Sequence, residues 1–363
     1  MVAFMSKGIS VYSGLNETLD ENLNYIDRAK KYGFDNVFTS LHIPEADYSK
    51  LISEFTAIVE HSKNMGMDVT ADISPKTYKF LGGKENDFKL LKELGISCAR
   101  VDFGFSPCEI AEFTKNPYGI KVEINGSTVT EKFLAEFEKF SPNYENIKAC
   151  HNYYPRRNTG ISLKTFEYKN KLLKKYGMKI SAFIPSLNNR RGPVFEGLPT
   201  LEMHREMDPV VSAKHLFAMG IDNVIFGDPF ADESMLQMVG KINEEVINFR
   251  INLYTNDEIE KKIIFNKVHI ERPDQAEDVI RSTSSRETLG KDSIINPHNN
   301  TQREIGFITI DNKDYLRYAG ELEICKKHLP VDKRVNIVGK IIDEEIFLMD
   351  YIKEEGKFSF EVY

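Results

Sequence analysis

The sequence predicts a (β/α)8 barrel, the TIM-barrel fold, followed by a smaller, mostly β domain. Eight short apolar segments lie in the first two thirds of the chain, and most are separated by an amphipathic helical stretch. Each segment ends in polar or small residues. The segments are 8–14, 36–44, 68–75, 98–106, 121–125, 147–154, 179–186 and 222–229. Eight strand-then-helix units match a fold that typically needs ~250 residues.

The helical stretches between the segments carry recognisable start and stop signals. The first is predicted over 18–32 and the second over 49–64, and each ends just before a glycine. Glycine suits this position because it adopts the left-handed backbone conformation that ends many helices. Five stretches end in this way, at Gly33, Gly66, Gly95, Gly177 and Gly220. The repetition indicates regular βα units.

The last third of the chain changes character. The 363 residues exceed the ~250–300 at which a single core usually stops growing, so a second domain is expected. Strands are predicted there at 261–268, 304–310, 320–324, 335–339 and 345–351. We therefore predict a barrel domain over residues 1–248 and a β domain over residues 249–363.

Composition narrows the classes of partner. The formal charge is −7 with 28% charged residues, and no stripe of Lys and Arg predicts nucleic-acid binding. Residues 1–6 lack the pattern of a signal peptide, and no apolar run approaches the ~18 residues of a membrane span. The four cysteines show neither CxxC pairing nor zinc-finger spacing. We expect a cytoplasmic protein that binds no nucleic acid and no membrane.

The polar ends of the predicted strands define a candidate site. In barrel enzymes the carboxyl ends of all eight strands share one face, where the chemistry takes place. Here that face is predicted to collect Tyr12, His42, Asp72, Asp102, Glu123, Asn152 and Asp228. The predicted site is therefore a pocket rich in carboxylates.

Asp72 and Asp102 are the first candidate catalytic pair. They lie on neighbouring predicted strands, which are ~4.8 Å apart in a sheet, so their charges are expected to couple. Coupling raises the pKa of one carboxyl and leaves the other ionised. The alternative is that Asp102 simply pairs with Arg100, which shares its strand face.

Glu123 and Asp228 complete the predicted catalytic set, although either could serve only as a hydrogen-bonding group at the barrel mouth. Paired carboxylates on a concave, Tyr-lined face are what glycoside hydrolysis requires. Metal-dependent chemistry uses the same residue types, but no HxH or HExxH arrangement occurs. We predict no metal and no cofactor, with a metal site as the alternative.

Two long loops are predicted to bind the substrate. The loop after the sixth strand contains Tyr153, and paired guanidiniums in the next loop can bind a phosphate or carboxylate. The candidates in that second loop are Arg190, Arg191, Glu202, His204 and Arg205. In the β domain, Arg286 closes a Ser/Thr-rich segment that is either a second anion site or an ordinary loop. Nucleotide-binding glycine loops and a GxSxG motif are missing from the sequence.

Several of these segments together resemble one bacterial family, the 6-phospho-N-acetylmuramidases. The resemblance covers essentially the whole chain. It rests on 8–12 (GISVY), 100–105 (RVDFGF), 151–155 (HNYYP) with Thr159 and Gly160, 191–193 (RGP), 197–202 (GLPTLE) with His204 and Arg205, and 226–228 (FGD).

The resemblance implies a TIM barrel followed by a cyclophilin-like domain. It also implies hydrolysis of the β-1,4 bond between N-acetylmuramic acid 6-phosphate and N-acetylglucosamine during cytoplasmic recycling of cell-wall fragments. The 6-phosphate and the lactyl carboxylate of such a substrate would give the arginine-rich loop an anionic partner. The sequence leaves open whether the protein forms a homodimer.

The seventh predicted strand carries no carboxylate, which argues against a simple covalent mechanism with two carboxylates. Participation of the substrate's own N-acetyl group is the variant that fits. A sugar-phosphate isomerase or lyase on the same barrel, and a non-catalytic sugar-phosphate sensor, are the alternative functions.

Overall fold

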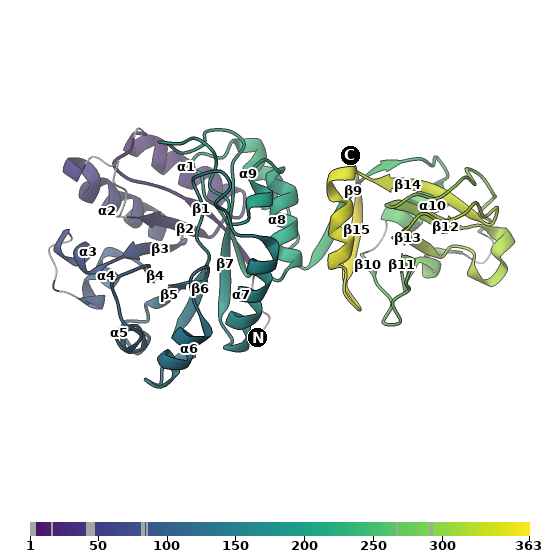
Figure 1. Cartoon of the computed structure of the whole chain (residues 1–363). Coiled ribbons are helices and arrows are strands. Elements are labelled where there is room, and N and C mark those ends of the chain that lie inside the picture. Colours follow the sequence, from purple (N-terminus) through teal and green to yellow (C-terminus); the bar gives the residue numbers. More distant parts are fainter. Residues whose placement is uncertain are drawn as a thin grey trace. The chain divides into compact units, whose positions relative to one another are not determined.

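Eight parallel strands close into a barrel with helices around it (Figure 1), which confirms the predicted fold class. The computed structural model describes residues 5–15, 17–40, 48–80, 84, 86–265, 268–290 and 293–363. Consecutive strands pair, and β1 pairs with β8 to close the barrel. The strands are β1 (Ser6–Ser10), β2 (Asn36–Ser40), β3 (Asp68–Ile73), β4 (Cys98–Val101), β5 (Lys121–Asn125), β6 (Ile147–Cys150), β7 (Lys179–Ile184) and β8 (Asn223–Phe226).

The helices of the barrel begin and end largely where their capping residues predict. Thr18 forms a capping box with Glu21 at the start of the first helix. The five glycines that were predicted to end helices all have positive φ. The helices are α1 (Leu19–Lys31), α2 (Tyr48–Asn64), α3 (Pro75–Phe80), α4 (Phe88–Leu94), α5 (Pro107–Phe113), α6 (Glu131–Glu138), α7 (Leu163–Lys175), α8 (Pro209–Ala218) and α9 (Glu233–Gly240), with short 3-10 turns η1 (Tyr144–Asn146) and η2 (Glu202–His204).

Most barrel strands are shorter than predicted at their carboxyl ends, and β4 shows the reason. The predicted strand ran to Ser106, but Ser106 is the N-cap of α5 and forms a capping box with Glu109. Because the cap begins a helix, the chain must leave the sheet earlier, after Val101. Asp102 and Phe103 consequently lie in the connection above the barrel.

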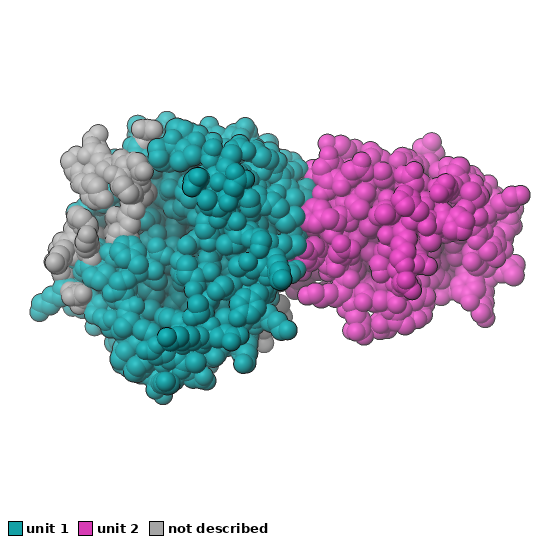
Figure 2. All heavy atoms as spheres, viewed as in Figure 1, with its two compact units in different colours: residues 1–216, 220–241 teal, residues 217–219, 242–363 magenta. Residues whose placement is uncertain are grey.

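The chain divides into two compact units, coloured separately in Figure 2. Unit 1 contains Met1–Leu216 and Gly220–Lys241, and unit 2 contains Phe217–Met219 and Ile242–Tyr363. Unit 2 is built on a seven-stranded sheet in the order β10-β15-β9-β14-β12-β13-β11. Its strands are β9 (Val246–Leu253), β10 (His269–Ile270), β11 (Val279–Arg281), β12 (Phe307–Asp311), β13 (Leu322–Cys325), β14 (Val335–Ile341) and β15 (Lys357–Val362).

Two predicted strands of unit 2 are wrong. Residues 261–268 were predicted as a strand, but α10 (Glu258–Phe265) lies there, because Asp257 accepts the amides of Ile259 and Glu260 and starts a helix. The 3-10 segment η5 (Asp343–Tyr351) replaces the strand predicted at 345–351. The remaining 3-10 segments are η3 (Ser285–Thr288) and η4 (Lys313–Tyr318).

Within the described residues, none of the helices has both the length and the apolar character needed to cross a membrane.

A buried acidic side chain, Asp311 on β12, should make the stability of unit 2 depend on pH. Burial, followed by the charges of Glu323, Glu321 and Asp332, raises the pKa of Asp311 to about 8. Because the folded chain then holds a proton that the unfolded chain releases above its ordinary pKa of ~3.9, stability is lost as pH rises from that value towards 8.

Asp311→Asn should therefore stabilise unit 2 by on the order of 1–3 kcal/mol at pH 8, with a smaller gain at pH 5. Urea unfolding of the full chain at both pH values measures the difference. Asp350→Asn, a change at an exposed acid of unit 2, is the control for the buried Asp311. Equal gains at the two pH values would contradict this electrostatic origin.

Candidate active site

The centre of the barrel holds a belt of alternating charges. Asp72 pairs in register with Arg100 on the next strand, Arg100 with Glu123, and Glu123 with Lys148. Paired residues of neighbouring strands face the same side of a sheet, so the four side chains meet. Arg100 Nη1 donates to Asp72 Oδ1 at 3.0 Å, and Lys148 Nζ lies 3.1 Å from Glu123 Oε2.

Burial makes these pairings obligatory. Arg100 is 4% exposed, Asp72 7% and Glu123 1%, and a buried charge without a partner is costly. Arg100 also approaches Glu123 through Nε at 3.7 Å and donates through Nη2 to Asn152 Oδ1 at 2.6 Å. Arg100 therefore joins β3, β4, β5 and the segment after β6 under the barrel mouth.

Asp102 stands out among the four predicted catalytic carboxylates because it is accessible. Its side chain is 34% exposed, whereas Asp228 is fully buried and the other two lie in the belt. Arg100 Nη2 lies 3.6 Å from Asp102 Oδ1, so the alternative pairing predicted from the sequence is present. The same guanidinium is hydrogen-bonded to Asp72, which couples the two acids through one cation.

The Asp72 carboxyl has a raised pKa. Burial is the largest cause, Arg100 opposes it, and the charge of Asp102 raises the pKa further. This direction is the one that the sequence predicted for one member of the pair.

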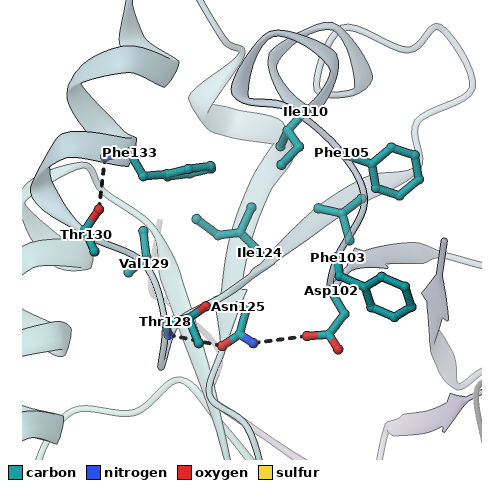
Figure 3. Close-up of a pocket in the computed structure, with 11 residues that line it drawn as sticks. Asp102, Phe103, Phe105, Ile110, Ile124, Asn125, Thr128, Val129, Thr130 and Phe133 are labelled. Atoms are coloured by element: carbon teal, nitrogen blue, oxygen red, sulfur yellow. Dashed lines mark hydrogen bonds between the residues drawn. The ribbon is translucent and has the colours of Figure 1, made fainter. Parts of the chain in front are cut away.

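A cavity of about 300 Å³ opens beside Asp102, at the carboxyl ends of β4 and β5 (Figure 3). Seven of its eleven lining residues are apolar, and Asp102, Asn125, Thr128 and Thr130 add polar surface. The lining includes Phe103, Phe105, Ile110, Ile124, Val129 and Phe133. Asn125 Nδ2 donates to Asp102 Oδ1 at 3.0 Å, which holds the carboxylate at the cavity edge.

Asp228 anchors a loop in this structure. Its Oδ2 accepts the amides of Ser186 and Leu198 and its Oδ1 accepts the amide of Arg191, each at 3.0 Å. The neighbouring Gly227 permits the close approach, because a Cβ there would lie 2.3 Å from Leu198 O. Burial raises the pKa of Asp228, and the three amides oppose this. Its predicted role on the substrate stays a prediction.

Arg191 lies between two aromatic rings above the barrel. Its guanidinium is 4.6 Å from the ring centroid of Tyr12 and 5.2 Å from that of Tyr153. Nη1 donates to Tyr153 Oη at 3.1 Å, and the buried Nε has no hydrogen-bond partner among the described residues. Of the arginines predicted to bind anions in the loop after β7, Arg191 makes the fewest side-chain hydrogen bonds to the described residues, so it keeps the most donors for a ligand.

Arg205 and Glu202 instead hold the two long loops together. Arg205 donates to both oxygens of Glu202 at 2.7 Å, and to the carbonyls of Arg156, Glu196 and Gly197 at 3.1 Å. These bonds use all five N–H groups of a guanidinium. The anion-binding role predicted for Arg205 therefore finds no remaining donor in this arrangement.

Arg190 is committed in a similar way. It donates through both terminal nitrogens to Glu206, and it also binds the carbonyls of Ser186 and Arg205. All three partners lie in the loop after β7, so Arg190 holds distant parts of that one loop together.

Two of the remaining predicted residues are engaged in contacts within the protein. His204 is fully buried and pairs with His215 at 2.8 Å. Arg286 belongs to unit 2, where it donates to Arg317 O at 3.0 Å. His42 lies outside the described residues. The sequence analysis missed Lys148 and Phe103 and treated Arg100 only as a partner for Asp102. The signal that could have revealed the charge belt was that acids and cations alternate from one predicted strand to the next.

Glu202→Gln should loosen the loops after β6 and β7. Hydrogen bonds from Arg205 are the main cause that lowers the pKa of Glu202 to about 2. Its stabilisation is therefore present above the ordinary pKa of ~4.3 and is lost as pH falls towards 2. With a neutral amide, Arg205 stays buried with weaker partners, at a local cost of about 1–3 kcal/mol.

Hydrogen exchange measured over 152–160 and 188–206 should then accelerate in Glu202→Gln at neutral pH. Glu167→Gln, at an exposed position of α7, is the matched control. Unchanged exchange in both loops would show that the Glu202–Arg205 pair does not hold them.

Groups of three or more His, Cys, Asp or Glu arranged to hold a metal ion do not occur within the described residues.

The fold and the site define a TIM-barrel protein with an exposed aspartate, a buried charge belt and an arginine at the face formed by the carboxyl ends of the strands. The chain belongs to the 6-phospho-N-acetylmuramidase family, a glycosidase family by its name. The N-terminal family model matches residues 7–241 and the C-terminal model matches residues 247–361, which confirms the family resemblance found in the sequence.

Two solved structures are similar over nearly the whole chain. An uncharacterized Bacillus cereus protein has 33% identity and a TM-score of 0.88, with 98% of this chain and 99% of that chain covered. A conserved Enterococcus faecalis protein of unknown function has 32% identity and a TM-score of 0.73, with 98% and 96% covered. A search of curated proteins gave no match.

Proposed function

We propose that this protein hydrolyses the β-1,4 bond between N-acetylmuramic acid 6-phosphate and N-acetylglucosamine, in the cytoplasmic recycling of cell-wall fragments. The observation that carries the proposal is the position of Asp102. It is the exposed carboxylate of the predicted set, it is held by Asn125 and Arg100, and it lies at the barrel face where such enzymes act.

In this proposal Asp102 faces the glycosidic oxygen and gives it a proton as the bond breaks. Asp72 and Glu123 are positioning residues, because they are buried and act through Arg100.

The second role in glycoside cleavage is attack on the anomeric carbon. In this proposal the substrate's N-acetyl carbonyl oxygen bonds to that carbon as the leaving oxygen departs with the proton. Water then opens this intermediate. Two observations favour this variant: β7 (KISAFI) carries no carboxylate, and three of the four predicted carboxylates are buried. Full activity on an analogue without the carbonyl would count against it.

Arg191 is proposed to bind an anionic group of the substrate, through the donors that Tyr153 leaves unused. Tyr12 and Tyr153 fix its guanidinium between their rings, which prepares it for a phosphate or carboxylate.

The test is to incubate the purified protein with the disaccharide, with and without its 6-phosphate, and to follow the products by mass spectrometry. Release of N-acetylglucosamine from the phosphorylated form alone is the expected result. No cleavage of either form would overturn the proposal and favour a lyase, an isomerase or a sugar-phosphate sensor.

A further inference from the structure

We infer that the cavity over β4 and β5 binds the uncharged sugar of the substrate, the leaving N-acetylglucosamine, while Arg191 binds the anionic sugar on the other side of Asp102. This inference rests on the proposed function and adds the direction in which the substrate lies across the barrel mouth.

The charge of the cavity is the first argument. Among the eleven described residues that line it, Asp102 alone carries a charge. A phosphate or carboxylate placed there would meet a negative charge with no cation in the lining, which is unfavourable in a partly desolvated site. The cavity therefore fits a neutral group.

The shape and chemistry of the lining are the second argument. Phe103 is 56% exposed, so its ring is accessible to a ligand in the cavity. Figure 3 shows Phe133 on one side of the cavity, Phe103 and Phe105 on the other, and Ile124 between them. Aromatic rings and aliphatic side chains suit the apolar face of a sugar and an acetamido methyl group.

The rigidity of Asp102 at the cavity edge is the third argument. Asn125 Oδ1 accepts the amides of Ser127 and Thr128 at 3.0 and 3.3 Å, while its Nδ2 donates to Asp102. Because every polar atom of this amide group is engaged, Asn125 holds the carboxylate in one orientation beside the cavity. A bond that joins a sugar in the cavity to the rest of the substrate would pass Asp102.

A chain of contacts then leads from Asp102 to the anionic side. Asp102 meets Arg100, which donates to Asn152. The residue after Asn152 is Tyr153, whose hydroxyl accepts from Arg191. The groups at the barrel mouth therefore follow a defined order. The cavity, whose lining has no cation, lies at one end, Asp102 lies in the middle and Arg191 lies at the other end.

The test measures binding of the two separate sugars, N-acetylglucosamine and N-acetylmuramic acid 6-phosphate, by titration calorimetry or ligand-observed NMR. The full-length protein is compared with Phe103→Ala and Arg191→Ala. Phe103→Ala should weaken binding of N-acetylglucosamine by about tenfold, roughly the loss of one aromatic contact, and leave the phosphorylated sugar unaffected. Arg191→Ala should do the reverse.

Tyr168→Ala is the matched control, since Tyr168 is a similarly exposed aromatic residue (51%) on α7, outside the cavity lining. It should change neither affinity. In steady-state assays of the disaccharide, Phe103→Ala should raise KM more than it lowers kcat.

The outcomes separate this inference from the proposed function. Suppose that the protein cleaves the disaccharide, but Phe103→Ala weakens binding of the phosphorylated sugar or of neither sugar. That result would overturn the inferred direction of the substrate and leave the proposed function standing. If the unaltered protein neither cleaves the disaccharide nor binds either sugar, both proposals fail.

Discussion

Asp102→Asn is expected to lower kcat/KM for the phosphorylated disaccharide by about 10²–10⁴-fold, the usual contribution of a positioned acid or base. The amide keeps the size of the side chain and can retain a hydrogen bond with Asn125, but it cannot give up a proton to the leaving oxygen. Because Asp102 is 34% exposed and lies outside the strand, the substitution should shift the thermal midpoint by little.

The matched control is Asp68→Asn, at the first residue of β3, where the strand pattern is exposed and the position is at the opposite end of the barrel. It should retain full activity. If Asp102→Asn folds normally and keeps more than about a tenth of the activity, Asp102 is not the group that acts on the glycosidic oxygen.

The barrel could be predicted from the sequence because its signals are local. Each helix that ends in a left-handed glycine, such as Gly33 or Gly177, marks one unit whatever the rest of the chain does. The errors in unit 2 have a local cause as well. The apolar pattern of the α10 residues does not clearly separate a strand from a helix. The hydrogen bonds that decide for a helix are those that Asp257 accepts from two backbone amides, and an apolar pattern does not reveal them.

The site was harder to predict, because the role of a side chain depends on the hydrogen bonds and ion pairs that it already makes within the protein. Asp72, Asp102 and Asp228 all follow or end barrel strands, yet Asp228 accepts three loop amides and Asp72 is turned into the charge belt. Arg191 and Arg205 have the same chemistry in the same loop. They differ in their free hydrogen-bond donors, because Glu202 accepts two hydrogen bonds from Arg205 and this contact forms only in the folded loop.

The largest effect on stability is expected for Arg100→Met. Methionine keeps much of the aliphatic stem but removes the cation that three carboxylates share. Removing one partner of a buried ion pair typically costs ~3–5 kcal/mol, because the other charge stays buried without compensation. The free energy of unfolding, measured in urea, should fall by about that amount, and activity should fall with it as Asp102 loses its partner.

The contacts within the charge belt indicate which buried acid causes the loss of stability in Arg100→Met. Glu123 retains Lys148 at 3.1 Å, whereas the ion pairs of Asp72 among the described residues are limited to Arg100. Asp72→Asn should therefore destabilise the unaltered protein but recover part of the stability of Arg100→Met. Lys121→Met, at an exposed position of β5, is the control for loss of a cation.

The pH dependence of Arg100→Met follows from the same contacts. Arg100 opposes the rise in the pKa of Asp72 that burial causes, so its removal must raise that pKa further. A carboxyl whose pKa is higher in the folded chain destabilises it increasingly as pH rises above the ordinary value of ~3.9. The deficit of Arg100→Met should therefore shrink from pH 8 to pH 5, and adding Asp72→Asn should remove part of it. A deficit that is equal at both pH values, and that Asp72→Asn does not reduce, would place the role of Arg100 in packing rather than in holding the buried charge of Asp72.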